Sequence, residues 1–186
     1  MRSTPRKFAD DQSLYTAALG ALVRRAYSVF EMRTYLDRRA AEPAAAKRVL
    51  ARLRQEKFID DARYALEFAR TRANLRRQGR HRITRELRTR GVADQHIEAA
   101  LESVFAETDE AALVRKVIQR RLRAVRGPLE QKKIASLYGA LLRAGFDSDL
   151  IRREVRAATK TIASEEPDAT VDVMTDMTAP DESIDS

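Results

Sequence analysis

Few residues in this chain have the types and spacing that catalysis or metal binding requires. Asp60 and Asp61 are adjacent carboxylates, but a hard cation needs further oxygen ligands, and no third acidic residue stands at a suitable spacing. His81 and His96 lack the cysteine or acidic partners of a metal pattern, and Ser28 lacks a nearby histidine–acid arrangement. We therefore expect no enzymatic activity, no cofactor and no metal site. The two aspartates are interpreted as helix caps.

Arginine and lysine side chains form three clusters that could bind phosphates or carboxylates. They lie in residues 70–90, 115–126 and 132–153. The planar guanidinium group suits such anions because it donates two hydrogen bonds at once. The candidates for contact with an anionic partner are Arg70, Arg76, Arg77, Arg80, Arg82, Arg85, Arg88, Arg115, Lys116, Arg120, Lys132, Lys133 and Arg143. The alternative is a solvated face with local ion pairs such as Glu86–Arg90.

Net charge supports an anionic partner. The formal charge is +8, yet residues 164–186 hold eight acidic side chains and no lysine or arginine. The preceding 163 residues therefore carry 36 basic against 20 acidic groups, a net charge of +16. A field of this strength attracts polyanions or acidic protein surfaces. The acidic tail has few large apolar residues and is predicted to be disordered, and we expect it to fold back over the basic face as a weak competitor.

Three stretches of the chain repeat one pattern, in which a helix with an apolar stripe is followed by a stop and a new helix. They are residues 32–50, 83–101 and 137–155, offset by 51 and 54 residues. A period of this size is typical of stacked helical modules that form a long array. The low glycine and proline contents, 6 and 5 residues, also favour helix. We predict an all-α fold of three tandem three-helix repeats, with about nine helices in an elongated body.

The predicted organisation divides the chain into five parts. These are a disordered N-terminus at 1–10, repeats at 11–57, 58–106 and 107–160, and an acidic disordered tail at 161–186. Cysteine is absent, which fits a reducing compartment. Neither a signal peptide nor a run of about 18 apolar residues is recognisable. We therefore expect a cytoplasmic protein without membrane contact.

Local signals predict where helices begin and end. Ser28 and Glu31 have the spacing of a capping box. A helix starting near Asp60 is expected to run to Gly79, which would be its left-handed cap. Gly91 and Gly145 are expected to stop later helices. Gly127 and Pro128 are expected to end one helix of the third repeat and open the next.

The same helices carry expectations about individual side chains. Val23 and Leu75 are assigned to buried apolar stripes, and Gly139 could allow a close helix contact. Arg63, Arg70 and Arg77 recur every seven residues and would share one outer helix face. For Arg72, which lies near an apolar stripe, pairing with a buried acid and contact with a partner both stay open.

Several blocks of residues make the chain resemble the RecX family, the bacterial regulators of the RecA recombinase. The blocks are Ser28-x-x-Glu31-Met32-x-x-x-Leu36, Phe58-Ile59-Asp60-Asp61-x-x-Tyr64-Ala65-x-x-Phe68-x-x-x-Arg72, Gly79-x-x-Arg82-Ile83-x-x-Glu86-Leu87-x-x-x-Gly91-Val92, and Leu142-Arg143-x-Gly145-Phe146-x-x-x-x-Ile151. The likeness spans residues 12–157 and omits the acidic tail. It departs from the pattern at Ala40, where the later repeats have glycine.

The resemblance implies a function as well as a fold. RecX-like proteins are curved, elongated bodies that lie in the helical groove of the RecA–DNA filament. They hinder filament growth and inhibit ATP hydrolysis, strand exchange and the filament-assisted self-cleavage of the LexA repressor. The implied partners are the RecA filament and single- and double-stranded DNA, and the implied state is monomeric.

Two other hypotheses compete with this one. A helix-turn-helix transcription regulator is suggested by the short turn at Gly91, although the same turn recurs in the third repeat, which suits scaffold packing better. Nonspecific duplex binding would fall steeply with salt. A stacking platform for single strands is not indicated, because aromatic residues make up only 6% of the chain.

Overall fold

The computed structural model describes residues 7–124 and 130–165, with side chains described up to residue 160. The described part contains nine helices and no strand, apart from an isolated β-bridge between Phe8 and Ala40. The helices are α1 (Asp11–Arg24), α2 (Val29–Asp37), α3 (Pro43–Gln55), α4 (Asp61–Asn74), α5 (Arg80–Thr89), α6 (Asp94–Glu107), α7 (Glu110–Arg123), α8 (Gln131–Ala144) and α9 (Ser148–Glu165).

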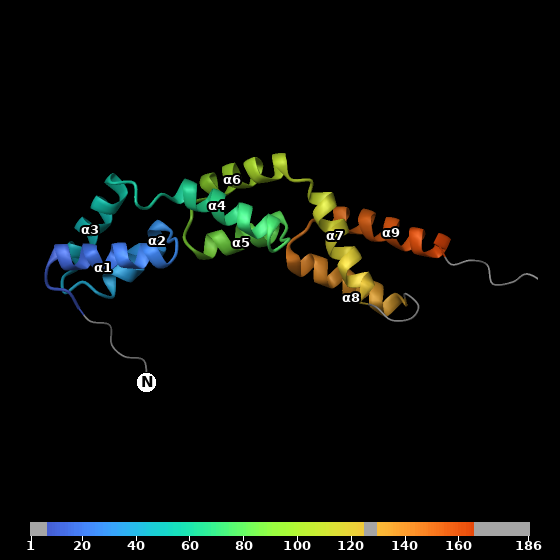
Figure 1. The fold of residues 1–186 in the computed structure, drawn as a ribbon, viewed down its shortest axis with the longest axis horizontal. Helices are drawn as coiled ribbons and strands as arrows, with labels where there is room; N and C mark the ends of the chain where they lie inside the picture. The colour runs from blue at the N-terminus through green and yellow to red at the C-terminus, as the bar shows by residue number, and fades with distance from the viewer. Residues whose placement is uncertain (1–6, 125–129, 166–186) are drawn as a thin grey trace, which may run out of the picture.

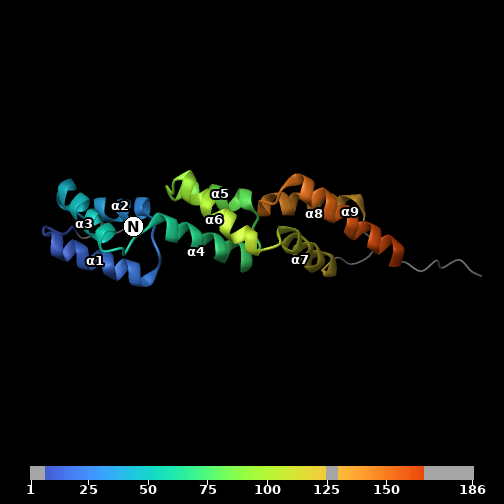
Figure 2. The same ribbon diagram turned by 90° about the horizontal axis from the view of Figure 1, so that it is seen from above.

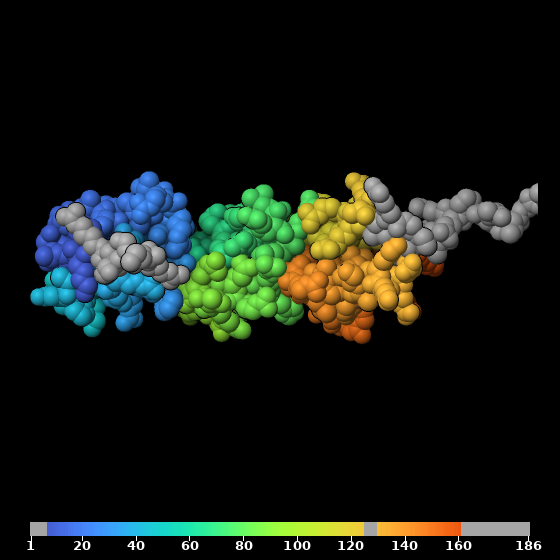
Figure 3. All heavy atoms as spheres, turned by 90° about the horizontal axis from the view of Figure 1, so that it is seen from below, coloured from blue at the N-terminus to red at the C-terminus, as the bar shows by residue number. Residues whose placement is uncertain are grey.

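The nine helices form three consecutive triplets that stand in a row along one long axis (Figures 1 and 2). We call them module 1 (α1–α3), module 2 (α4–α6) and module 3 (α7–α9). Figure 3 shows them as three successive lobes of a narrow, elongated body. The prediction of an all-α array of tandem three-helix repeats is confirmed.

Aspartate caps set the start of the first helix in every module. Asp10, Asp60 and Asp109 precede α1, α4 and α7, and each carboxylate accepts a hydrogen bond from a backbone N–H of the following turn. The three helices that follow have the same length of 14 residues. Ser28 forms the expected capping box with Glu31, and Asp147 caps α9 through the amides of two following residues. These local signals are sufficient for helix starts because the bonds span two or three residues.

The buried side chains fall into two groups. One belongs to module 1 and includes Leu14, Met32, Leu36 and Leu53, all fully buried. The other is continuous through modules 2 and 3. Alanines at positions 65, 69 and 73 of α4 are fully buried against it, which permits the close approach of α4 and α6.

The modules are joined by one repeated contact between second helices. At the first joint the Ser28 hydroxyl donates to the Arg90 carbonyl oxygen at 2.6 Å. At the second, the Gly79 amide donates to the carbonyl of Ala144 at 2.9 Å, and the His81 amide donates to the carbonyl of Gly145 at 3.1 Å. The carbonyl end of α5 thus meets the amide end of α2, and the carbonyl end of α8 meets the amide end of α5. At each joint, opposite ends of two helix dipoles lie together.

Gly79 and Gly145 make the second joint unusually close. A Cβ atom at Gly79 would lie 2.3 Å from the carbonyl oxygen of Gly145, and Gly145 itself has φ +88°. Gly91 at the first joint has φ +70° and packs against Phe30. The expected helix stops at Gly91 and Gly145 are confirmed, and the structure adds that both glycines are left-handed. Because both turns contact the preceding module, their recurrence reflects scaffold packing.

The expected role of Gly79 is wrong. α4 ends at Asn74, and Gly79 has φ −83° as the N-cap of α5. Arg77, with φ +52°, is the left-handed residue after α4. It lies beyond the helix, so it does not continue the helical face of Arg63 and Arg70. Sequence rules failed because glycine is required here by a contact with a distant segment.

Three further side-chain expectations fail. Val23 and Leu75 are 88% and 78% exposed, so neither lies in a buried stripe. The space around Gly139 contains only the guanidinium of Arg143, without a neighbouring helix close by. The prediction of disorder is wrong for residues 161–165, which continue α9, and for Phe8 and Asp10, which bridge to Ala40 and cap α1. Gly127 and Pro128, residues 1–6 and the rest of the predicted tail from 166 onward lie outside the described residues.

Candidate functional site

Five of the thirteen candidate cations have carboxylate partners within the protein. Arg70 pairs with Glu67, Arg80 with Glu110, Arg82 with Glu86, Arg88 with Asp94, and Arg115 with both Asp109 and Glu154. Apart from Arg82, these arginines keep 43–60% of their side chains exposed. Exposed pairs of this kind are weak. They leave the arginines accessible but partly neutralised.

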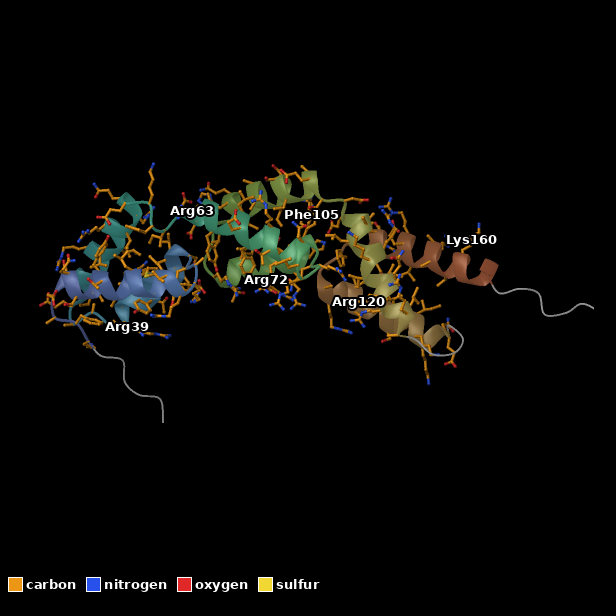
Figure 4. The ribbon with its side chains drawn as sticks, in the orientation of Figure 1. Arg39, Arg63, Arg72, Phe105, Arg120 and Lys160 are labelled. Carbon is orange, nitrogen blue, oxygen red and sulfur yellow. The ribbon has the colours of Figure 1, made fainter. Side chains whose placement is uncertain are left out.

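Seven candidates form no ion pair with any carboxylate among the described residues. They are Arg76, Arg77, Arg85, Lys116, Arg120, Lys132 and Arg143. They lie on modules 2 and 3, on or beside α4, α5, α7 and α8. In Figure 4, side-chain nitrogen atoms gather on the side of α5 away from α6 and continue along α7, where Arg120 is labelled. Lys133 is half-buried.

Arg77 combines an unpaired cation with an unfavourable backbone. Its amide bonds to the carbonyl of Ala73, and the next amide bonds to that of Arg72, both at 3.1 Å. This is the C-terminal motif that normally places glycine in the left-handed conformation. A side chain there costs roughly 1 kcal/mol. Backbone strain concentrates at functional positions, so Arg77 is a strong candidate for partner contact.

Arg72 and Arg82 instead build a structural network around Glu86. Arg72 lies 3.1 Å from one carboxylate oxygen of Glu86, and Arg82 lies 3.0 Å from the other. Burial of Glu86 opposes ionisation, but the hydrogen bond from Arg82 and the charges of Arg72, Arg82 and Arg90 hold its pKa below the ordinary value. The structural reading of Arg72 is thus confirmed. The expected Glu86–Arg90 ion pair is wrong, because Arg90 donates to the Glu86 backbone carbonyl at 2.8 Å.

The two adjacent aspartates, Asp60 and Asp61, accept hydrogen bonds from backbone amides. Asp60 accepts from the amides of Ala62 and Arg63. The Arg63 amide is the main cause that lowers the pKa of Asp60, against an opposing effect of burial. Asp61 accepts from the Val29 amide at 2.9 Å and so ties module 2 to module 1. Within the described residues, no group of three or more potential ligands gathers, and no helix is long and apolar enough to cross a membrane.

The structure also contains a groove that the sequence analysis missed. It has a volume of about 920 Å³ and lies between the end of α1 and the length of α4. Arg63 and Arg72 mark the two ends of its α4 wall in Figure 4. Val23, at 88% exposure, and Phe58, at 47%, contribute to its apolar lining. The available signal was Phe58, a large apolar residue two positions before the helix cap Asp60, with no assigned place in a stripe.

Comparison with known proteins gives one consistent family. Models of the first, second and third three-helix domains of RecX match residues 15–53, 60–101 and 107–155. The regulatory protein RecX of Halorhodospira halophila is 37% identical over 150 residues, covering 81% of this chain and 91% of that protein. The regulatory protein RecX of Stenotrophomonas maltophilia is 36% identical over 146 residues, covering 78% and 87%.

Solved structures agree on the fold. The crystal structure of RecX from Lactobacillus salivarius superposes with a TM-score of 0.70 at 19% identity, covering 81% of this chain and 97% of that one. A second crystal structure of a regulatory protein RecX gives a TM-score of 0.68 at 23% identity, covering 77% and 71%.

Proposed function

The chain belongs to the RecX family, and from this premise we propose that it regulates RecA by binding in the helical groove of the RecA–DNA filament. Bound there, it inhibits the ATPase, strand-exchange and LexA-cleavage activities of the filament. It thereby modulates recombination and the SOS response, and it carries out no reaction of its own. The protein acts in the cytoplasm as a monomer.

The distribution of charge on an elongated body is the observation that carries this proposal. Seven cations that have no ion-pair partner among the described residues extend over two consecutive modules. The modules stand in a row (Figure 1), so these cations can reach several phosphates or carboxylates along one track. Guanidinium groups bind both kinds of anion, which suits a partner made of DNA and protein together.

The test is the ATPase rate of RecA on single-stranded DNA with sub-stoichiometric amounts of this protein. We expect the rate to fall, because one elongated molecule in the groove would contact several RecA subunits. An unchanged rate would reject the proposal. A footprint on one particular DNA sequence at physiological salt would instead favour the helix-turn-helix alternative.

A pair of arginine variants tests the surface. Arg120→Ala removes an exposed cation that pairs with no carboxylate in the described part of the chain, whereas Arg88→Ala removes one that is paired with Asp94. If the basic surface contacts DNA phosphates, the first should weaken DNA binding about eightfold at ~0.1 M salt, the factor for one lost phosphate contact. The second should weaken it less. Equal effects would show that net charge matters and individual contacts do not.

The acidic tail gives an additional expectation. Residues 164–186 carry eight carboxylates beside a strongly cationic body, and we propose that they compete weakly for its basic face. Removing residues 164–186 should tighten DNA binding at low salt. No change in affinity would count against this role.

A further inference from the structure

The groove between modules 1 and 2 is apolar although the repeated architecture does not require it. Leu19, Leu22 and Val23 of α1 form one wall, and Tyr64 and Phe68 of α4 form the other. Leu19 and Leu22 pack at the edge of one core, and Tyr64 and Phe68 at the edge of the other. The groove therefore lies between the edges of two separate apolar cores, which do not pack against each other there.

The second joint provides an internal comparison. There the end of α4 and the start of α7 enclose a corresponding groove of about 370 Å³. Its lining includes Asn74, Arg77, Glu107 and Lys116. The N-caps Asp60 and Asp109 occupy the same place in the two grooves.

Equivalent positions differ in kind between the two joints. Tyr27 stands three residues after the end of α1, where Arg77 stands three after the end of α4. Seven residues after its aspartate cap, α4 has Glu67 and α7 has Lys116. The second groove is thus polar and small. Module stacking alone does not explain the large apolar groove of the first joint.

The charges at the first groove are mostly cationic. Its two carboxylates are already engaged, because Asp60 caps α4 and Glu67 pairs with Arg70. Arg63 and Arg76 line the same groove and pair with no carboxylate among the described residues. An occupant with carboxylates beside its apolar groups would satisfy this rim.

Three of the four aromatic rings that line the groove, all except Phe58, already have a cation or another ring against them, which disfavours stacking of nucleic-acid bases. The guanidinium of Arg25 lies 3.6 Å from the ring centroid of Tyr27. Arg72 and Arg90 both lie 4.7 Å from that of Phe68, and Tyr64 stacks on Phe68 with centroids 6.0 Å apart. Base binding needs free ring faces. The groove is therefore better suited to apolar side chains inserted by a partner protein than to stacked bases.

We infer that this groove binds a segment of the RecA protein in the filament, one that presents large apolar side chains next to carboxylates. The inference rests on the proposed function, and it divides the molecule by partner. Module 1 and α4, with Arg63 and Arg76 at the rim, hold protein through the groove, while the other candidate cations that lack an ion pair among the described residues face phosphates. Apolar burial of two or three side chains would supply most of the groove's affinity.

The experiment replaces Val23 with aspartate. Because Val23 is 88% exposed, Val23→Asp leaves the cores intact, which circular dichroism can verify. The variant should bind RecA filaments on single-stranded DNA about tenfold more weakly than wild type, since it places a charge in the groove and repels the partner's carboxylates. Its affinity for free single-stranded DNA should change less than twofold. The control is Leu142→Asn, which removes an exposed apolar side chain of α8 outside the groove without adding a negative charge beside Arg143, and it should bind filaments as wild type does.

A second experiment measures directly whether position 23 becomes buried when filaments bind. The chain has no cysteine, so Val23→Cys accepts a single environment-sensitive fluorophore. Adding filaments should shift its emission to the blue, whereas free DNA should not, and the same dye on Leu142→Cys should not respond.

The outcomes separate the two proposals. If wild type does not bind filaments, the proposed function fails and the groove inference fails with it. If wild type binds and Val23→Asp binds equally well, only the groove inference is wrong. An equal loss of free DNA affinity would assign the groove to nucleic acid. Loss of a wild-type dimer in Val23→Asp would assign it to a second copy of this chain. Either result overturns the inference.

Discussion

Replacing Gly79 with alanine should force modules 2 and 3 apart. The new Cβ would lie 2.3 Å from the carbonyl oxygen of Gly145 and 2.6 Å from the amide of Phe146, both backbone atoms that cannot rotate away. To restore an ordinary contact of about 3.4 Å, the two segments would have to move apart by roughly 1 Å. The hydrogen bonds from Gly79 to Ala144 and from His81 to Gly145, at 2.9 and 3.1 Å, would both be lost.

The expected cost follows from these contacts. Each lost hydrogen bond removes about 1 kcal/mol, and leaving its buried groups without partners costs about 1–3 kcal/mol more. Part of this is recovered if water enters the opened joint. We therefore expect Gly79→Ala to reduce the free energy of unfolding by ~3 kcal/mol, measured by urea denaturation. Hydrogen exchange of the His81 amide should become faster.

Gly139→Ala is the matched control in module 3. Its Cβ would meet only the flexible guanidinium of Arg143, at 3.3 Å, and it lies inside α8, where alanine is favoured over glycine by about 1 kcal/mol. This variant should be slightly more stable than wild type. If Gly79→Ala is as stable as Gly139→Ala and keeps the His81 amide protected, the reasoning about the joint is refuted.

Three further predictions concern single residues. Ser28→Ala removes a fully buried hydroxyl that caps α2 and donates to Arg90, so urea denaturation should show a loss of about 2 kcal/mol; an unchanged value would contradict the joint's contribution. Glu86→Gln should cost about 2 kcal/mol at pH 7, because two arginines lose their charged partner. Since the folded state lowers the pKa of Glu86, this stabilisation is present above its unfolded value and is lost as pH falls through the folded value; a wild-type–variant difference that stays constant down to pH 3 would disprove it. Arg77→Gly should raise stability by about 1 kcal/mol by relieving the left-handed backbone, yet weaken DNA binding about eightfold at ~0.1 M salt; unchanged DNA affinity would remove Arg77 from the binding surface.

Much of the fold was predictable because its signals are local. The capping box of Ser28 and the carboxylate cap of Asp60 act over two or three residues, so the sequence displays them directly. The left-handed stop at Gly145 is equally local. The repeat of these signals then predicts the module count.

The failures involve contacts between distant segments. Gly79 is glycine because Gly145 approaches it, and no neighbour in the chain indicates this. Val23 has the apolar character of a core residue, but its place beside a groove depends on how two modules meet. Likewise, Arg80 of module 2 forms an ion pair with Glu110 of module 3. Which candidate cations form ion pairs can therefore be known only from the assembled modules.

Main-chain hydrogen bonds help to hold modules 2 and 3 together, and this has an evolutionary consequence. These amides and carbonyls constrain the sequence mainly at two glycines, at positions 79 and 145. The apolar core that runs through both modules constrains their buried positions, so mutations at exposed positions can alter the surface chemistry of each module while the outline of the whole is kept. Such a scaffold can acquire a new specificity in one unit without redesigning its neighbours.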